Sequence, residues 1–119
     1  MTGVACLVMS TADPPPLREP TFFILSALSA EDSHGYRLLR SVEEMSQGRV
    51  QLRAGTLYGA LERLEGEGLV ARNGTSQGDG PVRTVYRLTE EGRTRLWQDV
   101  ARLEASIATA KASLRLANP

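Results

Sequence analysis

The stretch at residues 55–70, "GTLYGALERLEGEGLV", decides the fold, because a helical period runs through it and ends at a glycine before a strand-like run. Its apolar residues recur at spacings of four and three, which places them on one helix face: Leu57, Leu61 and Leu64. We expect a helix over residues 54–67 that packs through these leucines. Its other face carries Gly55 and Gly59, although a glycine inside a helix costs about 1 kcal/mol relative to alanine. The two glycines on this face must therefore serve a purpose other than the local stability of the helix.

Two explanations for the glycines remain open at this point. In the first, Gly59 packs against the preceding helix and Tyr58 belongs to the core. In the second, the small groups let the helix backbone lie close to DNA, as in a helix that reads the major groove. Thr56 would then offer a hydroxyl to phosphates or base edges, while Arg53 and Arg63 would add charge near the helix ends. Tyr58 lies near the boundary of the two faces, so the sequence does not decide how far it packs in the core and how far it contacts DNA.

Two more helices are expected before this one. Residues 20–30 are rich in apolar side chains, and Pro20 suits a first helical turn, where its missing N–H costs nothing. The run "HGYRLLRSVEEMSQ" follows, with Ser33 as its expected N-cap and Tyr36 as a packing anchor. Gly48 is placed to end this helix in a left-handed conformation. The core-facing stripe of the second helix is expected to comprise Leu38, Leu39, Val42 and Met45.

The remaining short runs predict a small amount of β-structure. The run "RVQL" (49–52) alternates enough for a short strand, and residues 69–73 form another strand-like run. The glycine-rich residues 74–81 predict a hairpin tip, from which residues 82–88 return as the partner strand. Three helices followed by a hairpin form a winged helix-turn-helix. The fold class is therefore mainly α with a small β-hairpin, and arginines lie on both wing strands: Arg72, Arg83 and Arg87.

A long last helix, about residues 90–116, carries a seven-residue apolar repeat. The positions of the repeat are Leu96, Val100, Leu103, Ile107, Ala110 and Leu114. Because the compact domain has too little surface to cover such a stripe, we expect a homodimer through this helix. The domains predicted are a flexible tail (1–17), the winged helix-turn-helix (18–88) and the dimerisation helix (89–117).

Composition excludes several functions. The 119 residues are enough for one domain, and no run of about 18 apolar residues could form a membrane helix. The single cysteine, Cys6, and the single histidine, His34, leave little for a metal site or a catalytic triad. We expect His34 to be a capping or surface residue. No enzyme signature, cofactor or metal is indicated. The N-terminus does not resemble a secretory signal, and the single cysteine favours a reducing cytoplasm.

The charge pattern is compatible with DNA binding without proving it. The formal net charge is zero, but thirteen of the fourteen basic residues are arginine and only Lys111 is lysine. Arginine suits bidentate contact with phosphate or guanine, although a GC-rich genome would produce the same bias. The candidate DNA-contacting residues are Arg37, Arg53, Gly55, Thr56, Tyr58, Gly59, Arg63, Arg72, Arg83 and Arg87. A protein-binding adapter built on the same fold is the alternative, since the reading helix also carries Glu62, Glu65 and Glu67.

Three aromatic side chains suggest a ligand site between the first and last helices. They are Phe22, Phe23 and Trp97, and a flat apolar ligand could stack among them. Ordinary dimer core is the competing interpretation, because Trp97 lies one step off the apolar repeat.

Four segments of the sequence resemble those of the PadR-like transcriptional regulators. In order they are "EPTFFILSAL", "HGYRLLRSVEEMS", "GTLYGALERLEGEGLV" and "YRLTEEG". The resemblance implies a homodimer that represses a promoter and releases it on binding a small aromatic or drug-like effector. It places residues 56–59 on the reading helix, 83–87 on the second wing strand and 96–114 on the dimerising helix.

Overall fold

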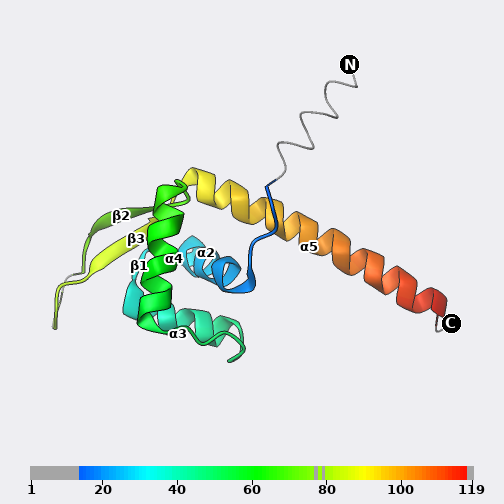
Figure 1. Ribbon diagram of the computed structural model, residues 1–119, viewed down its shortest axis with the longest axis horizontal. Coiled ribbons are helices and arrows are strands. Elements are labelled where there is room, and N and C mark those ends of the chain that lie inside the picture. Colours follow the sequence, from blue (N-terminus) through cyan, green and yellow to red (C-terminus); the bar gives the residue numbers. More distant parts are fainter. Residues whose placement is uncertain (1–13, 77, 79, 118–119) are drawn as a thin grey trace, which may run out of the picture.

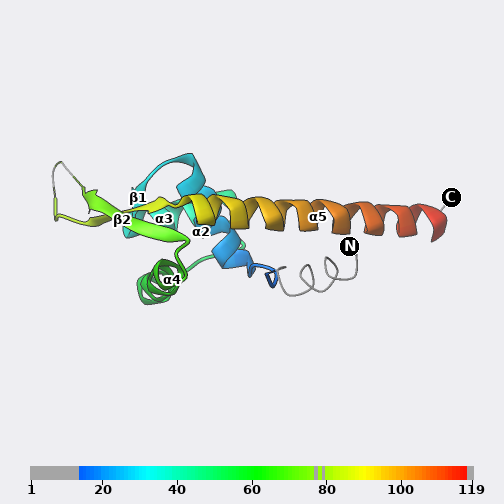
Figure 2. The ribbon, with the colours of Figure 1, turned by 90° about the horizontal axis from the view of Figure 1, so that it is seen from above.

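The computed structural model describes residues 14–76, 78 and 80–117. Its helices are α2 (Glu19–Ala30), α3 (Gly35–Met45), α4 (Ala54–Gly66) and α5 (Glu90–Ala117), and its strands are β1 (Ser33–His34), β2 (Val70–Thr75) and β3 (Thr84–Leu88). The shorter helices and the sheet form a body from which α5 projects (Figure 1). The hairpin of β2 and β3 extends from the opposite side of the body (Figure 2). The predicted winged helix-turn-helix with a long C-terminal helix is confirmed.

Helix α2 lies at the centre of the body. Pro20 stands in its first turn, as expected, and Ile24, Leu25 and Leu28 are buried in the core. The helix packs against α3, α5 and β3. Because it contacts both the helix-turn-helix and the long helix, α2 fixes α5 relative to the rest of the domain.

The N-cap of α3 lies one residue later than predicted. His34, not Ser33, is the N-cap, and its Nδ1 accepts the N–H of Arg37 at 3.3 Å. Ser33 was the wrong choice because it is extended in β1, where it pairs with Tyr86. The core stripe is confirmed at Leu38 and Val42 and is wrong at the far end, since Met45 is 45% exposed. Leu39 is partly buried against the core.

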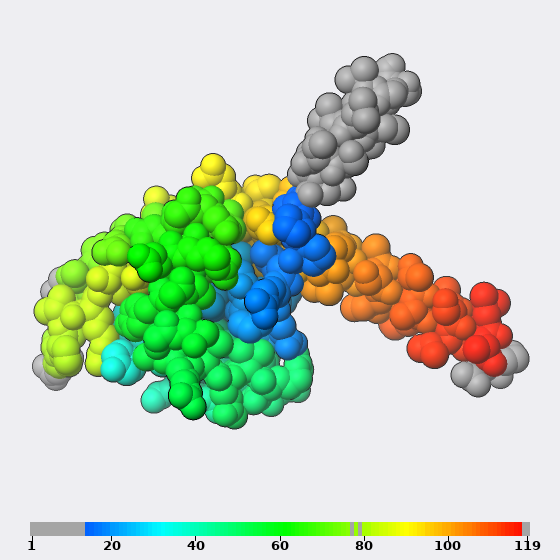
Figure 3. Space-filling view, in the orientation of Figure 1, coloured from blue at the N-terminus to red at the C-terminus, as the bar shows by residue number. Residues whose placement is uncertain are grey.

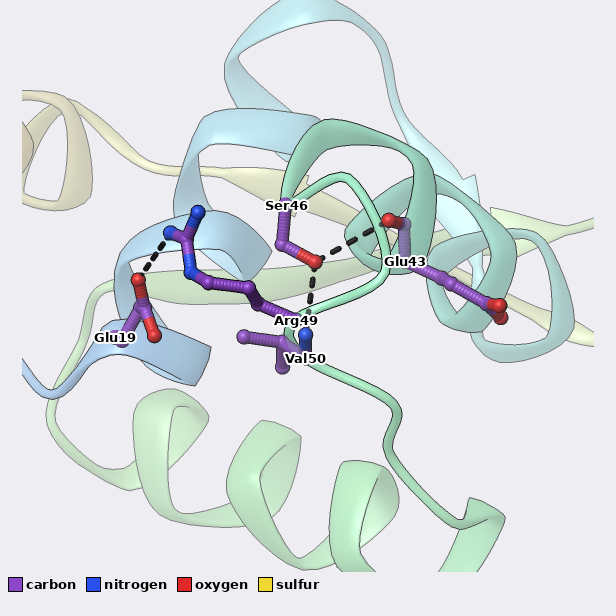
Figure 4. Close-up of polar contacts among 5 residues, drawn as sticks. All are labelled: Glu19, Glu43, Ser46, Arg49 and Val50. Atoms are coloured by element: carbon purple, nitrogen blue, oxygen red, sulfur yellow. Dashed lines mark hydrogen bonds and ion pairs between the residues drawn. The ribbon is translucent and has the colours of Figure 1, made fainter.

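The connection from α3 to α4 is held by one buried hydroxyl (Figure 4). Ser46 Oγ donates to the carbonyl of Glu43 at 3.2 Å and accepts the N–H of Val50 at 2.9 Å. Gly48 is left-handed at φ 84°, as expected, and Gln47 shares that conformation at φ 55°. The predicted strand at 49–52 is wrong, because Val50 bonds to this hydroxyl and buries its side chain instead of joining the sheet.

The sheet has three strands in the order β1-β3-β2, one more than the predicted hairpin. β2 and β3 pair antiparallel from Val70↔Leu88, with an irregularity in β2 between Arg72 and Thr75. The returning strand begins at Thr84, two residues later than predicted, and its Tyr86 and Leu88 are buried in the core. The third strand comes from the two residues before α3, which lie on the free edge of β3.

The wing joins α5 through a tight junction. Thr89 Oγ1 donates to the carbonyl of Gly68 at 2.7 Å and accepts the N–H of Gly92 at 2.9 Å. A Cβ at Gly92 would clash with the carbonyl oxygen of Leu69, so only glycine fits there. Gly68, predicted to end the reading helix, has a φ of 80°. These contacts hold the start of α5 directly against the end of α4.

Residues 14–17, expected at the end of a flexible tail, lie against α5. The N–H of Leu17 donates to Asp99 Oδ1 at 3.1 Å, and Arg95 donates to the carbonyl of Pro15 at 3.1 Å. Asp99 is buried and also accepts from Arg102 Nε at 3.1 Å. The rest of the predicted tail, with Cys6, lies outside the described residues. No helix in the described ranges is long and apolar enough to cross a membrane.

Candidate nucleic-acid interface

Helix α4 has one fully buried face and one open face. The predicted core leucines are confirmed, since Leu57, Leu61 and Leu64 are buried. On the other face, a Cβ added at Gly55 or Gly59 would find no described atom within 4 Å. Gly59 therefore does not pack against the preceding helix. Figure 3 shows α4, in green, on the surface of the body.

Tyr58 belongs partly to the core and partly to the surface. It is 38% exposed, and its ring and hydroxyl occupy the space that a side chain at Gly35 would need. Gly35 is buried at the start of α3. The ring of Tyr58 on α4 therefore requires a glycine at the start of α3, while Tyr58 itself stays partly exposed.

The arginines at the two ends of α4 differ in their surroundings. Arg53 is exposed at the N-cap position of the helix. Arg63 instead donates to Thr21 Oγ1 at 3.3 Å and lies 3.7 Å from Glu67 Oε2, so it ties α4 to α2. At the N-terminal end of α4, Thr56 is exposed as well.

The three arginines around the wing differ in their surroundings. Arg72 Nε lies 3.1 Å from Glu65 Oε2, which joins β2 to α4. Arg83 places its guanidinium 4.3 Å from the centre of the Tyr36 ring. Arg87 is exposed. Tyr36, expected as a packing anchor, is instead an exposed platform for an arginine from another element, and nothing in the local sequence around it indicated that contact.

The charges of two arginines act on His34. Burial lowers the pKa of His34 from its ordinary value of 6.5, and the positive charges of Arg83 and Arg37 lower it further. Arg37 in turn lies 3.8 Å from Glu31 Oε2. The neutral imidazole suits the capping role, because Nδ1 must accept a hydrogen bond. Across the described part of the chain, no group of three or more His, Cys, Asp or Glu could hold a metal ion.

The three aromatic residues predicted to form one ligand site are divided between two grooves. Phe22 and Phe23 meet edge to face, with ring centres 5.6 Å apart, and line a groove of about 310 Å³ between α2 and α5. Trp97 is 66% exposed and lines a separate groove of about 200 Å³ with Ser29 and Val100. The described residues therefore do not gather all three into a single pocket.

The apolar repeat of α5 changes character along the helix. Leu96, Val100 and Leu103 are partly covered by the body. Beyond them, Ile107 is 53% and Leu114 is 61% exposed, and Ala110 is exposed as well. The repeat thus continues for two turns or more after the body ends (Figure 2).

These features define the class of protein. It is a winged helix-turn-helix in which α4 exposes one face, the wing carries arginines and the last helix is long. Residues 24–98 match the family described as "Transcriptional regulator PadR-like family". The chain belongs to the PadR-like family of transcriptional regulators.

Relatives and solved structures agree with this assignment. The transcriptional regulator Rv3488 of Mycobacterium tuberculosis is 37% identical over 81 residues, which cover 68% of this chain and 72% of the relative. The transcriptional regulator YqjI of Escherichia coli is 33% identical over 69 residues, or 58% of this chain, but the match spans only 31% of YqjI.

Two crystal structures are similar in both fold and sequence. A PadR family transcription regulator from Clostridium difficile R20291 has a TM-score of 0.63 and 28% identity, covering 83% of this chain and 99% of its own. Bacillus subtilis PadR, solved in complex with operator DNA, has a TM-score of 0.58 and 25% identity, covering 66% of this chain and 45% of its own.

Proposed function

We propose that this chain acts as a homodimer that binds a near-palindromic DNA operator and represses transcription from it. The observation that carries the proposal is the open face of α4, where Gly55 and Gly59 leave the backbone uncovered. Close approach to the floor of a major groove gives that thin face a use. The similarity to Bacillus subtilis PadR, which was solved with operator DNA, supports the same kind of partner.

The outer half of α5 supports the dimer. Ile107 and Leu114 are exposed on a continuous apolar repeat, and burial of such side chains contributes about 1.5–3 kcal/mol each. A two-fold pairing of α5 would cover them. It would also set the two α4 helices at a fixed separation, and we expect them to match half-sites about 34 Å apart, one turn of DNA.

The arginines set how strongly salt affects binding. With a formal net charge of zero, the protein has few cations to offer to phosphates, and Arg63 and Arg72 already contact carboxylates. Arg53, Arg83 and Arg87 are the better placed candidates. We expect operator affinity to fall with salt, but with a shallower slope than for a strongly basic DNA-binding protein.

Release by a small aromatic or drug-like effector completes the proposal. Both grooves that contain predicted effector residues lie beside α5, so a ligand there would act on the helix that sets the half-site spacing. Trp97 is the only tryptophan of the chain, so its fluorescence reports directly on one groove. A compound that releases operator should quench this fluorescence over the same concentration range.

Selection of duplexes from a random pool by the full chain tests the central claim. Binding of the selected sequence is then compared with a shuffled duplex in gel shifts at several salt concentrations. A palindromic consensus bound by a dimer supports the proposal. Equal binding to the selected and shuffled duplexes contradicts it.

A protein-binding adapter is the second candidate. It is favoured by the carboxylates of α4, since Glu62 and Glu67 are exposed and Glu65 already engages Arg72. These groups would repel phosphates while attracting a basic protein surface. Failure to select any specific duplex, together with normal folding and dimerisation, would favour this reading.

A further inference from the structure

Residues 34–36 form a junction at which the wing and α4 both contact the start of α3. His34 pairs with Val85 on β3 and caps α3. Gly35 makes room for the ring of Tyr58 from α4. Tyr36 lies under the guanidinium of a wing arginine. Three consecutive residues thus connect the two elements that a winged helix directs toward DNA.

Arg83 is fixed at its backbone as well as at its side chain. Its N–H donates to Ser76 Oγ at 3.0 Å, and its carbonyl accepts the N–H of Ser76 at 2.7 Å. Its guanidinium then reaches across to α3 and lies 4.3 Å from the centre of the Tyr36 ring. The side chain is therefore directed back over the start of α3 instead of toward the tip of the wing.

The partner of Arg83 differs from those of the other arginines nearby. In the described residues, Arg37, Arg63 and Arg72 each lie within 4.0 Å of a carboxylate oxygen, whereas Arg83 is held by an aromatic face. A carboxylate occupies the donor edge of a guanidinium and offsets its charge. A ring occupies only the flat face and leaves the N–H donors at the edge available.

Arg83 and Arg37 differ in how far their charges are offset by a carboxylate. Burial and then the charges of Arg83 and Arg37 lower the pKa of His34, so both guanidinium groups lie near the start of α3. Arg37 shares its charge with Glu31 at 3.8 Å, and both of those side chains are more than half exposed. Arg83 therefore contributes the less compensated charge of this surface.

We propose that Tyr36 is a positioning residue that holds the guanidinium of Arg83 in place to contact a DNA phosphate beside the wing. The inference rests on the proposed DNA-binding function and deepens it. Tyr36 supplies a surface and no bond to DNA, and Arg83 makes the contact. A solvated arginine loses rotamer freedom when it binds DNA. Stacking on Tyr36 already restricts Arg83 before binding, so this entropy cost is smaller and the affinity for DNA is higher.

A double-mutant cycle on the full-length dimer with its selected operator tests this coupling. The variants are Tyr36→Leu, Arg83→Gln and the two combined, with Tyr36→Phe to keep the ring and remove the hydroxyl. Arg87→Gln, alone and combined with Tyr36→Leu, is the matched control, because it removes an exposed arginine of the wing only four residues after Arg83. Tyr36→Gln is a second ringless variant if the leucine variant folds poorly, as judged by circular dichroism and thermal unfolding.

Arg83→Gln should weaken operator binding roughly tenfold and reduce the slope of log affinity against log salt by about 0.9, the value for one phosphate. Tyr36→Leu should weaken binding by about two- to fivefold and also reduce the slope. In the Arg83→Gln background it should have no further effect, while with Arg87→Gln the losses should multiply. Tyr36→Phe should bind like the wild type.

Several results would overturn the inference. Multiplying losses for Tyr36→Leu and Arg83→Gln would show that the two residues act separately. A Tyr36→Phe variant as weak as Tyr36→Leu would assign the effect to a direct hydroxyl contact. An unchanged salt slope in Arg83→Gln would show that no phosphate contact was lost. If the wild type selects no operator, the DNA-binding proposal itself fails, which is a different outcome from these.

Discussion

Helices α4 and α5 both expose a long face to solvent, but the side chains on the two faces differ in size and polarity. The open face of α4 carries Gly55 and Gly59 and has almost no side-chain bulk. The open face of α5 carries Ile107 and Leu114 and is apolar. A thin polar face suits close approach to a hydrated, charged surface, whereas an apolar stripe gains free energy only when another apolar surface covers it. The comparison therefore assigns two kinds of partner to two helices of one chain.

The largest expected effect concerns α5. Replacement of Ile107 and Leu114 together by Glu should make the chain monomeric at micromolar concentration, because four apolar side chains lose their cover across the two-fold axis at about 1.5–3 kcal/mol each. Sedimentation equilibrium or light scattering measures the oligomeric state. Operator affinity should fall with it, since one half-site alone binds weakly.

A control for this change lies on the same helix. Ala105→Glu with Ala112→Glu adds the same charges seven residues apart, at exposed positions away from the apolar repeat. That variant should remain dimeric. A monomer in both cases would attribute the effect to charge alone and would remove the apolar stripe as the interface.

The second effect concerns the thin face of α4. Gly59→Leu should weaken operator binding on the order of 100-fold, equivalent to about 2.7 kcal/mol, because the added side chain would separate the helix from the groove. Since no described atom lies within 4 Å of a Cβ at this position, the fold should be unharmed. Its stability should rise by up to about 1 kcal/mol, because leucine is the better helix former. Gel shifts and urea unfolding measure the two quantities.

Gly66→Leu is the matched control. Gly66 is the last residue of α4, and a Cβ there also meets open space. This variant should bind operator normally. Loss of binding in both variants would mean that α4 tolerates no bulk for reasons other than DNA, and normal binding by Gly59→Leu would remove the thin face from the interface.

The third effect tests how α4 is held. Gly35→Ala should destabilise the fold by about 1–3 kcal/mol, because the new methyl group would collide with the ring of Tyr58. Combining it with Tyr58→Ala should recover much of that loss, which urea unfolding of the single and double variants would show. Gly55→Ala, at an open position, serves as the control. Equal losses with and without Tyr58 would contradict the contact.

Features with a local cause were predictable, and features with a distant cause were not. The buried face of α4 follows from the spacing of Leu57, Leu61 and Leu64, and its end follows from Gly68. The strand β1 was missed because two residues have no periodicity, and only the edge of β3 makes them a strand. The run at 49–52 alternates like a strand, yet a serine hydroxyl takes up the N–H of Val50.

The candidate interface shows the same limit. The exposure of Gly55 and Gly59 was one of two alternatives that the sequence allowed, because the position of α3 decides between them. The roles of Gly35 and Tyr36 depend on Tyr58 of α4 and on Arg83, the residue before β3, and both are distant in the chain. Similarly, Trp97 lies one step off the apolar repeat, and one helical step of about 100° is enough to place it in a different groove from Phe22 and Phe23.

The smallest expected effect concerns the junction that supports α4, and it depends on pH. Burial first, and then Arg83 and Arg37, lower the pKa of His34 below its ordinary value of 6.5. The unfolded chain therefore binds more protons than the folded chain just below pH 6.5, so His34 makes the free energy of unfolding fall as the pH decreases through that window.

His34→Asn keeps an N-cap acceptor but does not titrate. Urea unfolding at pH 7.5 and 5.5 should therefore show a smaller pH effect in the variant than in the wild type, while the oligomeric state set by α5 stays the same. An identical pH effect in both proteins would show that the pKa of His34 is the same in the folded and unfolded chains. It would contradict the effect of burial and of the two arginines on this imidazole.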